Sequence, residues 1–154
     1  MNTIFKDYLT VAEKWALVAT AIGFIHHIDH VLRFDHSGWP FRAGVNAFTY
    51  SLLIYPLIVV LLFARGRRRL RVTLAFLLFL FPTLAHIFIE TPFMQYRTWA
   101  SRPEVNLLGV SSPVLGTVAV VVTVLLSTVT FVMLIAFLRA REPSPETPDA
   151  SENG

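Results

Sequence analysis

The chain has 154 residues, of which 55% are hydrophobic and only 15% charged. Soluble domains average about 45–50% apolar and about 25% charged residues, so this composition is typical of a one-domain integral membrane protein. The absence of cysteine excludes disulfides and thiolate metal sites, and the basic residues behind the net charge of +3 lie beside apolar segments, which argues against nucleic-acid binding.

Four apolar stretches follow a short mixed segment at residues 1–14, which is expected to lie at the membrane interface. Each stretch has about the 20 residues that a helix needs to cross a bilayer, or more. The spans are predicted at about 15–34, 47–64, 72–90 and 110–138. Residues 139–154 are acidic and rich in Pro and Ser, so we expect a disordered cytoplasmic tail. The sequence therefore predicts an all-α integral membrane protein, a four-helix transmembrane bundle.

Basic residues predict the orientation of this bundle. Four spans place the amino terminus, the turn Arg65–Arg71 and the tail on one face, and the turn alone contains five arginines. By the positive-inside rule this face is cytoplasmic, so both termini are expected in the cytoplasm and the protein in the plasma membrane. The turn is also expected to bind anionic lipid headgroups. The charge-free fourth span, which contains Gly116, is a candidate surface for a homo-oligomer or a partner membrane subunit.

Polar residues gather near the ends of the first and third spans. His26 and His30 are four residues apart, as are His86 and Glu90, so each pair lies on one face of its helix. His27 points to a different face. With a rise of about 1.5 Å per residue, the two pairs are expected at similar depths in the outer half of the bilayer. Ionisable groups at such a depth are costly and therefore indicate a functional site.

Three imidazoles and a carboxylate suit zinc, iron, manganese or copper(II). The predicted metal ligands are His26, His30, His86 and Glu90. A metal with an open position would support hydrolysis with Glu90 or Asp29 as the catalytic base, whereas iron or copper would support redox chemistry. Asp29 or Asp35 is a candidate acceptor that orients a ligating imidazole.

Other interpretations stay open at this point. One histidine from each of the first and third spans would provide axial ligands for haem b, with Arg33 as the residue that binds a propionate. The same groups would also suit a proton- or ion-handling accessory subunit without catalytic activity, or simple structural hydrogen bonding. The run from His26 to His30 resembles part of a histidine box of membrane desaturases and hydroxylases. Those enzymes need several boxes, however, and this chain has five histidines in total, so we reject this assignment.

Overall fold

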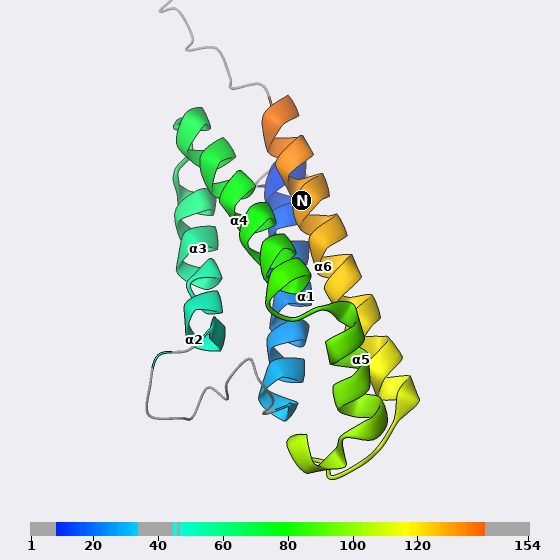
Figure 1. Ribbon diagram of the computed structural model, residues 1–154. Helices are drawn as coiled ribbons and strands as arrows, with labels where there is room; N and C mark the ends of the chain where they lie inside the picture. Colours follow the sequence, from blue (N-terminus) through cyan, green and yellow to red (C-terminus); the bar gives the residue numbers. More distant parts are fainter. Residues whose placement is uncertain (1–8, 34–44, 46, 141–154) are drawn as a thin grey trace, which may run out of the picture.

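A computed structural model describes residues 9–33, 45 and 47–140, and all its regular elements are helical (Figure 1). The predicted interfacial residues before Leu9, the candidate acceptor Asp35 and the acidic tail after Ala140 lie outside the described residues. The elements are α1 (Val11–Leu32), α2 (Ala47–Ser51), α3 (Ile54–Phe63), α4 (Arg68–Phe88), α5 (Pro92–Ser101), the 3-10 helix η1 (Pro103–Val105) and α6 (Pro113–Arg139).

Three helices, α1, α4 and α6, are long and apolar enough to cross a membrane. The prediction of an all-helical protein is therefore confirmed for the described residues, with three helices suited to a membrane. Helix α1 begins at Val11, four residues before the predicted Trp15, because Thr10 and Glu13 form a capping box. The Thr10 hydroxyl accepts the Glu13 N–H at 3.2 Å, and the Glu13 carboxylate accepts the Thr10 N–H at 2.7 Å.

The predicted second span is interrupted rather than continuous. Helix α2 ends at Ser51 and α3 begins at Ile54, two residues before Pro56. Proline has no N–H, so the Leu52 carbonyl cannot receive the regular helical hydrogen bond from Pro56. That carbonyl instead accepts the Tyr55 N–H at 3.2 Å. The apolar stretch Phe48–Phe63 is shorter than the other three, and its crossing of the membrane stays a prediction.

Helix α5 lies in the connection between the predicted third and fourth spans. It begins after Thr91, whose hydroxyl accepts the Met94 N–H at 3.3 Å, and Pro92 occupies the first helical position. Helix α5 then packs closely on α6 at Gly116. A Cβ atom at Gly116 would lie 2.7 Å from the carbonyl oxygen of Tyr96, so only glycine permits this approach. Gly116 thus serves a contact within the chain.

The bundle is built around α6, which packs against α1, α4 and α5, while α3 packs against α4 and α1 (Figure 1). Small residues on α1 allow its close packing, and its Ala16 is fully buried, as are Leu61 and Met133 of the same apolar core. The start of α1, the turn between α3 and α4 and the end of α6 lie at one end of the bundle. The end of α1 and helix α5 lie at the other.

A buried carboxylate joins the elements at the first end. Glu13 is 1% exposed and accepts hydrogen bonds from Arg65 Nε at 3.0 Å and from Arg71 Nη2 at 2.9 Å. Arg68 donates to the carbonyl of Leu138 on α6 at 2.9 Å. Three of the arginines assigned to lipid headgroups therefore also bind groups of the chain itself, while the lipid contact stays a prediction.

Candidate metal centre

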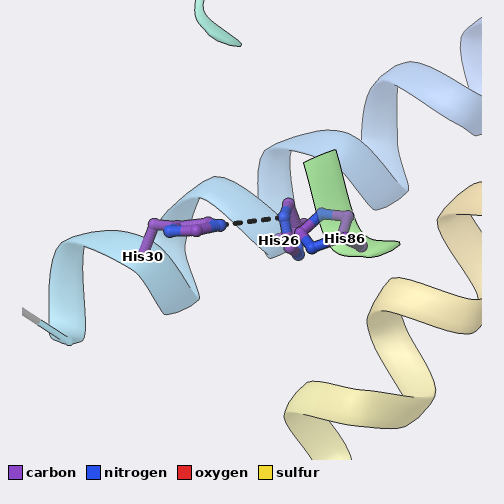
Figure 2. Close-up of side chains that lie close together, drawn as sticks. All are labelled: His26, His30 and His86. Carbon is purple, nitrogen blue, oxygen red and sulfur yellow. Dashed lines mark hydrogen bonds between the residues drawn. The ribbon is translucent and has the colours of Figure 1, made fainter. Parts of the chain in front are cut away.

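Three of the predicted ligands converge at the second end of the bundle. His26 and His30 come from α1 and His86 from α4, and all three are buried, with 4%, 8% and 8% of their surface exposed. One ring nitrogen from each lies within 4.8 Å of the others. Nε2 of His26 and Nε2 of His30 lie 3.0 Å apart, and a dashed line marks this contact in Figure 2. The His26 ring stands edge to face with the other two, at centroid distances of 4.6 and 4.7 Å.

The fourth predicted ligand, Glu90, lies just after α4 and turns back onto its end. The N–H groups of Ile89 and Glu90 both donate to the Ala85 carbonyl, at 2.8 and 2.9 Å, so the chain closes over the last helical turn. Glu90 Oε2 thereby lies 3.2 Å from His30 Nε2 and 3.7 Å from His86 Nδ1. The carboxylate is 2% exposed and is adjacent to the histidine cluster, defined as His26, His30 and His86.

Arg33 lies directly after α1 and is fully buried between two carboxylates. Its Nε and Nη2 donate to Asp29 Oδ2 at 2.8 and 2.6 Å, and its Nη1 donates to Glu90 Oε1. Trp99 on α5 donates its indole N–H to Asp29 Oδ1 at 2.8 Å. A buried guanidinium needs such carboxylate partners. Asp29, predicted as a base, Arg33, predicted to bind a haem propionate, and Glu90 therefore form an ion-pair layer beside the histidine cluster.

Two further polar residues, Gln95 and Thr123, were missed by the sequence analysis. Gln95 on α5 is fully buried, and its Nε2 lies 3.0 Å from His86 Nδ1 and 3.2 Å from Glu90 Oε2. Thr123 on α6 donates to Gln95 Oε1 at 2.9 Å and lies 3.3 Å from His26 Nδ1. The Thr91-Pro92 start signal would have predicted α5, and with it Gln95. Nothing in the sequence distinguishes Thr123 from the other threonines of α6.

His27 is buried but faces α2 and α3 instead of the histidine cluster. Its Nδ1 lies 2.6 Å from the Tyr55 hydroxyl and its Nε2 lies 3.0 Å from the Ser51 hydroxyl. Ser51 donates its own proton to the Phe48 carbonyl at 2.6 Å, so it accepts from His27 Nε2, and Tyr55 donates to Nδ1. Both ring nitrogens are thus used to hold α2 and α3 against α1.

The donor set fits a divalent transition metal. With Zn–N bonds of about 2.0–2.1 Å, two nitrogens on a tetrahedral zinc ion lie about 3.3 Å apart. The 3.0 Å between His26 and His30 is close to this value, and because all separations are within 4.8 Å, the third histidine needs to move inward by at most roughly 1.5 Å. Imidazole and carboxylate ligands suit zinc, iron, manganese or copper(II).

Comparisons with known proteins assign the chain to no family: no family model, no curated protein and no solved structure matches it. The chemistry of the site is therefore inferred from the chain's own residues and their geometry.

Proposed function

We propose that this is a membrane protein that holds one divalent transition-metal ion at His26, His30 and His86, with Glu90 as the fourth ligand. The observation that carries the proposal is the convergence of three buried imidazoles from two helices within 4.8 Å. The site lies in the outer half of the plasma membrane, in a bundle of four spans with both termini in the cytoplasm.

The charges around the histidine cluster favour a cation. Arg33 carries one positive charge between the carboxylates of Asp29 and Glu90, so the ion-pair layer retains one negative charge. The remaining negative charge lies beside neutral imidazoles and attracts a cation to them. Arg33 binds Glu90 Oε1, which leaves Oε2 facing His30 at 3.2 Å as a monodentate ligand.

The chemistry depends on the ion that is bound. Zinc would supply a Lewis acid, whereas iron or copper would supply one-electron redox chemistry on a lipophilic substrate. Of the two predicted bases, Glu90 is nearer to the ion, because its Oε2 faces the histidine cluster. Asp29 accepts from Arg33 and Trp99, and its role is to position Arg33.

A metal ion bound directly by the side chains fits this geometry better than haem b. The His26 and His86 rings stand edge to face with centroids 4.7 Å apart. A porphyrin held between these two helices would require the rings to separate and turn. Arg33, the residue predicted to bind a propionate, lies between two carboxylates, which would compete with the propionate for its guanidinium group.

A second candidate is a proton- or ion-handling accessory subunit without catalytic activity. It is favoured by a continuous chain of polar contacts that runs from Thr123 through Gln95 and Glu90 to His30 and His26. Every buried side-chain nitrogen or oxygen among the described residues has a hydrogen-bond partner, so this network is satisfied by the chain's own groups. Such a network would relay protons across the outer part of the bundle.

Metal analysis of the full chain in lipid nanodiscs separates the two candidates. Purified wild type should bind close to one equivalent of metal, supplied as Zn²⁺ or Co²⁺ and measured by elemental analysis and visible absorption. His26→Ala, His30→Ala and His86→Ala should each weaken binding more than about 100-fold, beyond the effect typical of an outer-layer residue.

His27→Ala is the matched control, since His27 is a buried histidine on the same helix that faces α2 and α3. It should retain the metal. Wild type that takes up neither Zn²⁺ nor Co²⁺ would contradict the metal centre, and so would equal loss of metal in all four variants. A metal-free wild type that conducts protons, with conduction lost in His30→Ala, would support the second candidate.

A further inference from the structure

Two uncharged side chains from helices outside the ligand set surround the histidine cluster. Gln95 comes from α5 and Thr123 from α6, and both are buried, with 0% and 3% of their surface exposed. Together they contact His86, Glu90 and His26. We propose that Gln95 and Thr123 are positioning residues of the metal centre that select the tautomer of His26 and direct its Nε2 toward the ion.

The orientation of the Gln95 amide follows from its neighbour Glu90. An ionised carboxylate only accepts hydrogen bonds, so the group that faces Glu90 Oε2 at 3.2 Å must be the amide NH₂. The same nitrogen lies 3.0 Å from His86 Nδ1, which also lies 3.3 Å from the backbone carbonyl oxygen of Glu90. The carbonyl oxygen of Gln95 therefore faces Thr123. The reversed amide would place two acceptors against each other.

The orientation of Thr123 follows in turn from Gln95. A hydroxyl has one hydrogen, and Thr123 donates it to Gln95 Oε1 at 2.9 Å. Toward His26 Nδ1, 3.3 Å away, the Thr123 oxygen then acts as an acceptor. His26 must carry its proton on Nδ1, and its Nε2 bears the lone pair. This is the nitrogen that lies 3.0 Å from His30 Nε2 inside the histidine cluster.

Metal-bound histidines commonly donate their second ring N–H to a fixed acceptor, which sets the tautomer and the ring orientation. Here the acceptor is a hydroxyl held by an amide that also contacts the carboxylate ligand. One side chain, Gln95, thereby orients two ligands: Glu90 after α4 directly, and His26 on α1 through Thr123. This inference rests on the proposed metal centre and adds to it the residues that prepare the site before the ion arrives.

Thr123→Val tests the inference, because it keeps the shape of the side chain and removes the hydroxyl. His26 Nδ1–H then has no acceptor at this position, and the other tautomer, with its proton on Nε2, becomes competitive. We expect Co²⁺ affinity to fall about 10- to 100-fold, with an altered visible spectrum of the bound ion. Thr123→Ser should restore both the affinity and the spectrum, because serine retains the hydroxyl.

Thr130→Val is the matched control. Thr130 is a buried threonine of the same helix whose hydroxyl donates to the Leu126 carbonyl at 2.8 Å. Its replacement should leave Co²⁺ affinity and spectrum unchanged. Gln95→Leu should weaken binding by a similar factor as Thr123→Val, and the double variant should lose less than the product of the two factors, because both residues act through one chain of contacts.

The outcomes separate this inference from the metal centre itself. Wild type without bound Co²⁺ would remove the proposed function and the inference with it. Wild type that binds Co²⁺, with Thr123→Val equal to Thr130→Val in affinity and spectrum, would retain the metal centre and overturn the positioning role. A purely structural hydroxyl would change thermal stability in Thr123→Val without changing the Co²⁺ spectrum.

Discussion

Helix α1 carries a buried polar cluster near each end, and the two clusters differ in kind. Near its start, Glu13 accepts from the Thr10 N–H and from two arginines of the α3–α4 connection and α4; we name this group the Glu13 cluster. Near its other end, His26 and His30 meet His86 in the histidine cluster. Both clusters tie α1 to α4, yet they present opposite chemistry.

In the Glu13 cluster, strong donors surround a single acceptor. Both oxygens of Glu13 receive hydrogen bonds from N–H groups, and two guanidinium groups exceed its one negative charge. A metal cation has no role there. In the histidine cluster, three imidazoles and a carboxylate face one another, and the adjacent ion-pair layer has one more carboxylate than guanidinium. Burial alone therefore does not indicate a metal site, and the proposed metal centre depends on the balance of donors and acceptors.

Removal of Glu13 should produce the largest loss of stability. Breaking a buried ion pair costs about 3–5 kcal/mol, and we expect about 3 kcal/mol for Glu13→Ala because its partner Arg65 is 58% exposed. Thermal unfolding in detergent measures this change. Co²⁺ affinity of the folded fraction should stay at the wild-type value, since the Glu13 cluster provides no ligand. If Glu13→Ala kept normal stability and lost Co²⁺ binding, the contrast between the two clusters would be wrong.

A methyl group at Gly116 should produce a smaller loss of stability together with a loss of metal affinity. The new Cβ would lie 2.7 Å from the Tyr96 carbonyl oxygen and would push α5, which carries Gln95, away from α6. We expect Gly116→Ala to cost about 1–3 kcal/mol, as overpacking commonly does. Both quantities are measured by thermal unfolding and Co²⁺ titration.

Gly23→Ala on α1 is the control for Gly116→Ala. Its Cβ would meet Ile54 and Leu126 side chains at 3.6 and 3.8 Å, which are ordinary contacts. Because alanine favours helix by up to about 1 kcal/mol over glycine, stability should be equal or higher. If Gly23→Ala weakened Co²⁺ binding as much as Gly116→Ala, the contact between α5 and α6 would not be the cause.

Tyr55→Phe should produce the smallest effect. It removes the hydroxyl that donates to His27 Nδ1 at 2.6 Å, and a hydrogen bond of this kind contributes about 0.5–1.5 kcal/mol. Co²⁺ affinity should not change, because His27 is outside the histidine cluster. Tyr50→Phe, at a side chain that is mostly exposed, should change neither quantity. Loss of Co²⁺ in Tyr55→Phe would instead make His27 part of the metal centre.

Much of the helical content could be predicted from the sequence. Long apolar stretches predict α1, α4 and α6 because backbone groups in a membrane must bond within their own helix. The offset of four residues between His26 and His30 predicts a shared face for the same local reason. The interruption between α2 and α3 has a visible cause in Pro56, but a neighbour could equally have satisfied the freed carbonyl.

The sequence by itself determined which residues carry lone pairs and on which helix faces they lie, since helical spacing is a local property of the backbone. Only the tertiary structure decided which of them meet. The approach of α1 to α4 joins His26 to His86, the turn after α4 brings Glu90 back to them, and the contact at Gly116 brings Gln95 to Thr123. Each of these contacts depends on the packing of helices that are distant in sequence, and no local pattern encodes that packing.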